Sequence, residues 1–180
     1  MKIGLYGGTF DPIHWGHIEV AKDAKIYFKL DKVIFVPNSF SPLKKDKPSY
    51  SIEGRLERIN NKLMNEIDLY LDTYQVTQKT ESYTIDLILH YHSMVNFNTE
   101  IYYIMGSDAL LEFDKYREWT KILDLVKLIV IERPGYNGEK FLKNYPQYKN
   151  RIEIKKVGNI EGGYNISSTK IRKEQLTNSK

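Results

Sequence analysis

The sequence contains no cysteine in its 180 residues. Disulfide bonds, thiolate metal sites and cysteine nucleophiles are therefore excluded. Long apolar runs are also missing, since none approaches the roughly 20 residues that a membrane-spanning helix needs. The amino-terminal stretch "MKIGLYGGTF" contains glycines and is followed by Asp11, so the apolar part of a signal peptide cannot form. These absences favour a cytoplasmic protein with no membrane partner.

The excess of positive charge is small. Lysine and arginine number 27 and aspartate and glutamate 23, which leaves a net charge of +4. This charge suits anionic partners but is too small to require nucleic acid, and no stripe of basic and aromatic residues is visible. With 41% apolar and 28% charged residues, the composition is that of an ordinary globular protein. We expect one domain over residues 1–180, long enough to bury a single core.

Apolar stretches of strand length alternate with longer helical patterns along the chain. The predicted strands are Lys2–Tyr6, Lys32–Val36, Leu69–Leu71, Ile101–Met105, Leu128–Ile131 and Ile152–Lys156. The predicted helices are Gly16–Lys29, Ile52–Glu66, Tyr83–His92, Ala109–Phe113, Thr120–Val126 and Ser168–Gln175. This alternation predicts an α/β fold, a parallel sheet with helices on both faces. Ligands of such folds bind beyond the carboxyl ends of the strands, at the point where the strand order reverses.

The stretch "GGTFDPIHWGH", residues 7–17, follows the first predicted strand. Gly7 and Gly8 permit a tight turn and let backbone amides approach a ligand. His14 and His17 bracket the start of a helix, whose free N–H groups form an anion site. The stretch matches neither the P-loop nor the dinucleotide-binding pattern. An ordinary helix start that happens to carry two histidines is the structural alternative.

A second candidate is "NISSTKIR", residues 165–172. Ser167, Ser168 and Thr169 are favourable N-cap residues, and Arg172 projects from the first turn of the helix that follows. Hydroxyl groups and a guanidinium at a helix start suit an anion. The structural alternative is a capped helix with a solvated arginine.

A third candidate is "IMGSDAL", residues 104–110, in which a buried strand ends in Gly-Ser-Asp. Asp108 falls at the carboxyl edge of the sheet, where it could accept hydrogen bonds from ribose hydroxyls. An aspartate that caps a helix is the alternative. Arg55 and Arg58, in "GRLERI", are predicted to lie on a solvated helix face.

The first two motifs together, G-G-T-F-D-P-I-H-x-G-H and I-S-S-T-x-I-R, resemble those of the H-x-G-H nucleotidyltransferase superfamily. Within it, the chain is similar to the bacterial nicotinate-nucleotide adenylyltransferases. The segments "VPNSFSPLKK", "SYTIDLI", "GSDALLEF" and "VIERPGY" have counterparts in that family at similar spacing. The resemblance therefore covers almost the whole chain, and the paired motifs are its most specific part.

The resemblance implies a Rossmann-like fold and Mg²⁺-dependent transfer of AMP from ATP to nicotinate mononucleotide, giving deamido-NAD and pyrophosphate. It also implies three groups of site residues. The catalytic group is His14, His17, Lys44 and Arg172; the ATP-binding group is Gly7, Gly8, Thr9, Phe10, Gly106, Asp108, Ser168 and Thr169; the mononucleotide-binding group is Asn38, Tyr83, Thr84, Tyr116 and Trp119.

These residue types suit a reaction in which anions must be brought together. The attacking mononucleotide phosphate is already an anion, so no general base is required. Catalysis then rests on positioning and on stabilising charge as pyrophosphate leaves. Mg²⁺ would arrive with ATP, because it retains waters and binds substrate phosphates. No protein ligand for the metal is expected.

The chain departs from the family pattern at three places. Tyr116-Arg117 stands where Trp-Tyr is usual, so Tyr116 is expected to stack on the pyridine ring, with Trp119 as an alternative or as a core residue. Leu43 replaces a polar residue of the usual P-P-H-K. Only residues 173–180 follow Arg172, where relatives have a further helix, which leaves a homo-oligomer open.

Other functions compete with this interpretation. A related transferase acting on nicotinamide mononucleotide or phosphopantetheine, or a cytidylyltransferase, would share the histidine motif. The segments "SYT" and "GSDAL" favour the pyridine mononucleotide. A non-catalytic nucleotide sensor is disfavoured because His14, His17 and Arg172 are all present.

Overall fold

The computed structural model describes residues 1–39, 47–78, 81–132, 135–156 and 168–178. Six parallel strands form one sheet in the order β3-β2-β1-β4-β5-β6. The strands are β1 (Lys2–Gly8), β2 (Lys32–Pro37), β3 (Leu69–Leu71), β4 (Glu100–Gly106), β5 (Lys127–Glu132) and β6 (Ile152–Lys156). All six predicted strands are confirmed, as is the α/β fold class.

The described helices are α1 (Trp15–Phe28), α2 (Ile52–Leu63), α3 (Tyr74–Thr77), α4 (Thr84–Met94), α5 (Ser107–Leu110), α6 (Trp119–Leu125), α7 (Glu139–Asn144) and α8 (Ser168–Asn178). Two short 3₁₀ turns, Phe113–Lys115 and Pro146–Tyr148, complete them. Helices α3 and α7 were not predicted from the sequence. They contain only 4 and 6 residues, too few to show a helical period.

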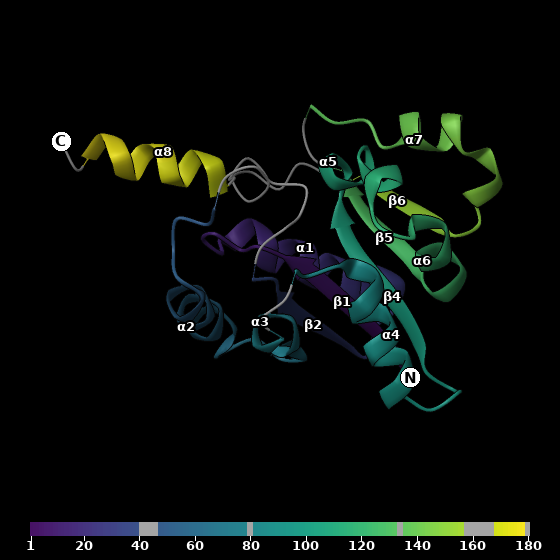
Figure 1. The fold of residues 1–180 in the computed structure, drawn as a ribbon, viewed down its shortest axis with the longest axis horizontal. Coiled ribbons are helices and arrows are strands. Elements are labelled where there is room, and N and C mark those ends of the chain that lie inside the picture. Colours follow the sequence, from purple (N-terminus) through teal and green to yellow (C-terminus); the bar gives the residue numbers. More distant parts are fainter. Residues whose placement is uncertain (40–46, 79–80, 133–134, 157–167, 179–180) are drawn as a thin grey trace.

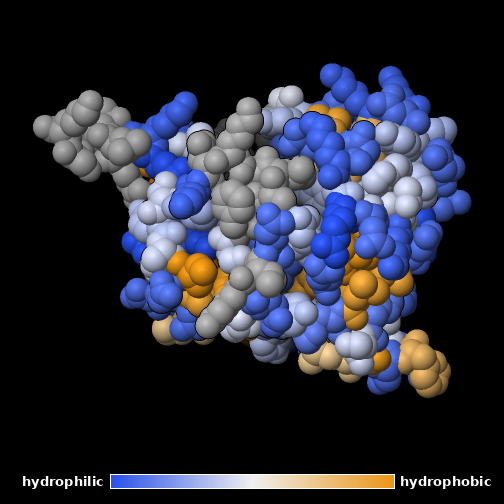
Figure 2. Space-filling view, viewed as in Figure 1, coloured by the Kyte–Doolittle hydropathy of each residue, from blue (hydrophilic) through white to orange (hydrophobic). Residues whose placement is uncertain are grey.

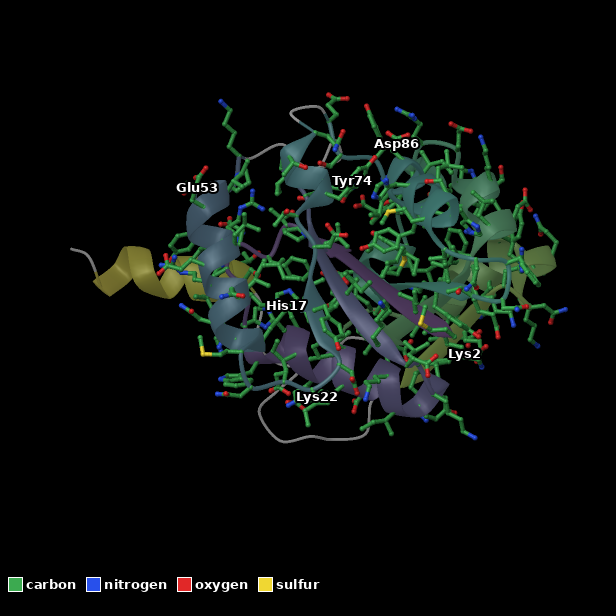
Figure 3. All side chains as sticks on the ribbon, turned by 90° about the horizontal axis from the view of Figure 1, so that it is seen from below. Lys2, His17, Lys22, Glu53, Tyr74 and Asp86 are labelled. Carbon is green, nitrogen blue, oxygen red and sulfur yellow. The ribbon has the colours of Figure 1, made fainter. Side chains whose placement is uncertain are left out.

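Helices cover both faces of the sheet (Figures 1 and 3). Alternate side chains of a strand point to opposite faces, so Ile3 and Leu5 of β1 join one core cluster and Tyr6 the other. The first cluster packs against helices α4, α5, α6 and α7, and the second against α1 and α2. In Figure 3, His17 and Lys22 lie on the α1 side of the sheet, and Tyr74 and Asp86 lie on the α4 side.

The strand order reverses between β1 and β4. The chain runs outward from β1 through β2 to β3, then returns to β4 on the other side of β1. The crevice beyond the carboxyl ends of these two central strands is where ligands of open α/β sheets bind. Gly8, at the end of β1, and Gly106, at the end of β4, lie at this edge. The first and third sequence motifs therefore meet there.

The face shown in Figure 2 is largely hydrophilic, with separate hydrophobic patches. Among the described helices, none is long and apolar enough to cross a membrane.

Candidate active site

The loop from β1 to α1 places both motif histidines at the helix start. His14 is the N-cap residue, with extended backbone at φ −141° and ψ 170°. Its N–H group donates to Nδ1 of His17 over 3.2 Å, and both side chains are buried. Because Nδ1 accepts this bond, the neutral His17 ring carries its proton on Nε2. His17 is thereby fixed as a donor through Nε2.

Gly7 and Gly8 lie within β1 and form no turn, which corrects the sequence prediction. Close packing explains these glycines instead. A Cβ atom at Gly7 would lie 2.3 Å from Oη of Tyr103, and one at Gly8 would lie 3.0 Å from Cζ of Phe10. The backbone at the end of β1 is therefore in contact with aromatic side chains on both sides.

Phe10 has left-handed backbone, with φ 46°, which is uncommon for a residue with a side chain. Its ring is 3% exposed and packs between Tyr6, His17 and Phe35. The predicted contact of Phe10 with ATP is thus left to its backbone, because the ring is part of the core. Strained backbone of this kind is found at functional sites where surrounding contacts hold it in place.

Helix α8 meets this first loop, although the two are far apart in the sequence. The Ser168 hydroxyl donates to the Pro12 carbonyl over 2.9 Å. Arg172 donates to the Asp11 carbonyl over 2.5 Å and lies 3.6 Å from the Asp11 carboxylate. A second nitrogen of Arg172 donates to the Thr169 hydroxyl over 3.3 Å. The two sequence motifs therefore form a single site.

Asp11 also connects the first loop to the segment that precedes α2. Its carboxylate accepts from the backbone N–H groups of Ser49, at 2.8 Å, and Tyr50, at 2.9 Å. Asp11 is 6% exposed, and the arginine beside it supplies a compensating charge. Asp11 was not among the predicted site residues, because the sequence does not show which groups a carboxylate in a loop will bind.

Two of the predicted mononucleotide-binding residues, Tyr83 and Thr84, lie at the start of α4. A helix that begins at Tyr83, as predicted, would have Ser82 as its N-cap, but the N-cap of α4 is Tyr83. Ser82 instead contacts Ser39, with 3.0 Å between the two hydroxyl oxygens. The hydroxyl of Thr84 lies 3.4 Å from Oη of Tyr103, whose ring borders Gly7. Tyr103 therefore connects the end of β1 to the first turn of α4.

Tyr116 and Trp119 occupy different surroundings. Burial raises the pKa of the Tyr116 phenol, and nearby Tyr103 and Asp108 raise it further. Trp119 packs among Phe113, Phe141, Tyr145 and Tyr148, with its ring centroid 4.9 Å from that of Tyr145. Of the two, Tyr116 is the one that lies beside Tyr103 and Asp108, whereas Trp119 belongs to an aromatic cluster.

Gly106 and Asp108 lie at the carboxyl edge of β4. Gly106 is the N-cap of α5, and Asp108 falls in the first turn of that helix. The alternative in which Asp108 is itself the cap is therefore wrong. Asn38 follows β2 and donates its N–H to the Gly8 carbonyl over 3.0 Å, which places it beside the first loop. Lys44 lies outside the described residues.

Arg55 is the main residue that sequence reasoning placed wrongly. It is 1% exposed, although it was predicted to lie on a solvated helix face. Its guanidinium donates to the carbonyls of Thr9, at 2.8 Å, and Asn38, at 2.7 Å. Burial lowers its pKa, while the negative charges of Asp11 and Glu53 oppose that change. Arg58, one turn later, is exposed as predicted and lies 4.1 Å from the Tyr50 ring.

Known proteins resemble this chain over nearly its full length. A family model described as Cytidylyltransferase-like matches residues 5–174. A probable nicotinate-nucleotide adenylyltransferase of Clostridium botulinum is 32% identical over 177 residues, covering 98% of this chain and 86% of that protein. One from Aquifex aeolicus is 36% identical over 153 residues, covering 83% of this chain and 90% of that protein.

A solved structure has the same fold. The nicotinic acid mononucleotide adenylyltransferase of Plasmodium falciparum, complexed with NaAD, matches with a TM-score of 0.79 at 22% identity. The match covers 96% of this chain and 82% of that one. The fold and the paired motifs define a nucleotidyltransferase, and the chain belongs to the cytidylyltransferase-like family. Within that family it belongs to the nicotinate-nucleotide adenylyltransferases.

Proposed function

We propose that this protein transfers AMP from ATP to nicotinate mononucleotide, which yields deamido-NAD and pyrophosphate in NAD biosynthesis. The observation that carries the proposal is the contact between the two motifs. Ser168 and Arg172 of α8 lie against Pro12 and Asp11 of the first loop. This contact gathers hydroxyls, a guanidinium and the N-terminus of α1 beside the carboxyl ends of β1 and β4, where a triphosphate would meet donors from two sides.

In the proposed reaction, a phosphate oxygen of the mononucleotide attacks the α-phosphorus of ATP. A new phosphorus–oxygen bond forms as the bond to pyrophosphate breaks, and no proton has to move. His17 would donate from Nε2 to a phosphate oxygen, since its Nδ1 accepts from His14. Arg172 would bind phosphate oxygens with its planar guanidinium. The chain thereby stabilises negative charge that grows on the leaving pyrophosphate.

The donor set of the site fits a metal ion that arrives with ATP. Among the described residues, no group of three His, Cys, Asp or Glu side chains could hold a metal ion. Mg²⁺ would then be held by the phosphates and by water, with at most light contact to the protein. When bound, it neutralises part of the triphosphate charge.

The mononucleotide would lie between the start of α4 and Tyr116. The Tyr116 ring, partly buried and with its centroid 5.1 Å from that of Phe113, would stack on the pyridine ring. Asp108, at the end of β4, would accept from ribose hydroxyls of the adenosine. A reaction that consumes ATP fits the cytoplasm.

The test is a pyrophosphate-release assay with Mg²⁺ and a panel of substrates. ATP and CTP would each be paired with nicotinate mononucleotide, nicotinamide mononucleotide and phosphopantetheine. We expect the fastest release from ATP with nicotinate mononucleotide. Faster release from phosphopantetheine or from CTP would assign the chain to a different transferase. ATP binding without release from any pair would support a nucleotide sensor.

A further inference from the structure

Arg55 lies in the first turn of α2 and is buried beneath the loops of the candidate site. Its Nη1 donates to the carbonyls of Thr9 and Asn38, at 2.8 and 2.7 Å, and its Nη2 donates to that of Ser39, at 3.2 Å. Three backbone carbonyls from two loops therefore converge on one buried side chain. One loop leads to the motif histidines, and the other follows β2.

The second loop continues this connection to the start of α4. The N–H of Ser39 donates to the Ser82 hydroxyl over 3.2 Å, and the two hydroxyl oxygens lie 3.0 Å apart. The peptide unit that joins Asn38 to Ser39 thus bonds Arg55 through its carbonyl and Ser82 through its amide. Because a peptide unit is planar, fixing one side also fixes the direction of the other.

Gln75 of α3 also contacts the segment that precedes α4. The amide nitrogen of Gln75 donates to the Tyr83 carbonyl over 3.1 Å, and Gln75 is 6% exposed. The Ser82 hydroxyl lies 3.5 Å from the Gln75 carbonyl, so a series of contacts leads from Arg55 through Ser39, Ser82 and Gln75 to the Tyr83 carbonyl, directly before Thr84. In the first loop, the Thr9 carbonyl held by Arg55 belongs to the peptide unit that enters Phe10, the residue with φ 46°.

We propose that Arg55 is a positioning residue that fixes the phosphate-binding loop and the mononucleotide-binding residues relative to each other. It touches neither substrate. One nitrogen orients the Thr9–Phe10 peptide of the first loop. Nη1 and Nη2 together orient the Asn38–Ser39 segment. That segment in turn holds Ser82, and thereby the start of α4, in place. The inference rests on the proposed function, since it assigns the two loops to the two substrates.

An arginine suits this role better than a lysine. Its rigid fork can point several N–H groups at carbonyls in fixed directions. Lysine keeps the positive charge, which faces the negative charges of Asp11 and Glu53, but it lacks the fork. The substitution Arg55→Lys therefore separates geometry from charge.

The experiment measures KM for each substrate and kcat, together with ATP binding by calorimetry. For Arg55→Lys we expect both KM values to rise and kcat to fall by about tenfold or more, because small displacements of bound reactants are costly in rate. Arg58→Lys, one turn along the same helix and exposed, is the matched control and should keep wild-type kinetics. A folded Arg55→Lys protein with wild-type KM values for both substrates would overturn the proposal.

Ser82→Ala tests only the connection from Arg55 through Ser39 to the start of α4. It keeps the proposal testable if Arg55→Lys does not fold. It removes the contact with Ser39 but leaves the Thr9 contact of Arg55 intact. We expect the KM for the mononucleotide to rise several-fold with an unchanged KM for ATP. Equal changes in the KM values of both substrates, or no change in either, would contradict a connection from Arg55 through Ser82 to the mononucleotide-binding residues. In the double variant, the two effects on mononucleotide KM should be non-additive, because both act through the Asn38–Ser39 peptide.

Calorimetry separates failure of this inference from failure of the proposed function. If the wild-type protein releases no pyrophosphate with any mononucleotide, the proposed function fails, whereas weakened ATP binding by Arg55→Lys still supports the positioning of the first loop. If the wild-type protein is active and Arg55→Lys binds ATP normally, the inference fails by itself.

Discussion

At the residue scale, the two histidines of the first loop have distinct tasks. The backbone N–H of His14 donates to Nδ1 of His17. The centroids of the two rings lie 3.8 Å apart, with an angle of 34° between the ring planes. The Nε2–H group of His17, whose tautomer is fixed by the bond from His14, is therefore the donor that we expect to bind phosphate.

The first prediction concerns His17. The substitution His17→Ala removes the donor on Nε2, and loss of a charge-stabilising donor lowers kcat by about 10²–10³. We expect this drop in a protein whose circular dichroism remains that of the wild type. His92→Ala, which removes a histidine at the far end of α4, should leave kcat unchanged. Near-normal turnover of His17→Ala would show that the ring has only a structural role.

The sequence alone indicated candidate residues that neighbouring positions reveal. It did not indicate residues whose surroundings come from distant segments of the chain. His14, His17, Ser168 and Arg172 fall at helix starts, which capping preferences reveal. Arg55 gave no such sign, because the pattern "GRLERI" shows a charged face and not what covers it. Burial of Arg55 arises only when the loops after β1 and β2 close over α2.

At the element scale, all strands were predicted because each is an apolar run of strand length. The role of the two glycines of β1 was predicted wrongly. A glycine pair suggests a turn, whereas here it leaves room for aromatic rings from β4 and the first loop. The start of α4 was also displaced by one residue, since Ser82 is a favourable cap that the fold uses to contact Ser39. Neither contact is local in the sequence.

The second prediction tests the packing of β1 against β4. Gly7→Ala would place Cβ 2.3 Å from Oη and 3.1 Å from Cζ of Tyr103. Inserting a methyl group into such a contact costs roughly 1–3 kcal/mol. We expect a lower free energy of unfolding by urea denaturation. The loss should be smaller when Tyr103→Phe is the background, because the nearest atom has been removed.

Gly54→Ala is the control for this measurement. Its Cβ would lie no nearer than 3.5 Å to Arg58 and Ser51, within helix α2. Alanine is the better helix former by about 1 kcal/mol, so this variant should be at least as stable as the wild type. A Gly7→Ala protein of undiminished stability would mean that Tyr103 moves aside freely.

The third prediction concerns the start of α4, a helix of 11 residues. Its first turn offers backbone N–H groups and the positive end of the helix dipole. A carboxylate can accept from two such donors, whereas a carboxamide has one accepting oxygen and presents its own N–H groups to the other donor. An unmatched buried donor costs roughly 1–3 kcal/mol, and each 1.36 kcal/mol is about tenfold in rate.

We therefore expect kcat/KM for nicotinate mononucleotide to exceed that for nicotinamide mononucleotide by tens-fold or more, under identical ATP and Mg²⁺. Arg117 lies over the Tyr83 ring and pairs at 2.8 Å with Asp86 of the first turn, so the preference is expected to come from the backbone N–H groups and the helix dipole and not from a net side-chain charge. Comparable values for the two mononucleotides would exclude a carboxylate site here.

At the scale of the whole molecule, the site forms from the two extremes of the described chain. The contact between Ser168 and Pro12 joins residues 156 positions apart, and that between Arg172 and Asp11 joins residues 161 apart. Bringing such distant segments together is entropically unfavourable, and the described contacts are few and partly exposed. Elements held in this way open more readily than the core of the sheet.

The last prediction follows from this weak attachment. A ligand that bridges the first loop and α8 stabilises the closed arrangement, and at 100 times its Kd it can slow exchange through local opening by up to about 100-fold. We expect ATP with Mg²⁺ to protect the amides of residues 7–17 and 168–178 together in hydrogen exchange. Helix α7, which packs with the aromatic cluster around Trp119, should exchange as before. Arg172→Lys keeps the charge but not the planar guanidinium, so protection of both segments should weaken in parallel at the same ATP concentration. The control is Lys115→Ala, which removes an exposed charge paired with Glu112 and should leave the protection of both segments unchanged. Protection of the first loop without that of α8 would show that ATP binds without engaging Arg172.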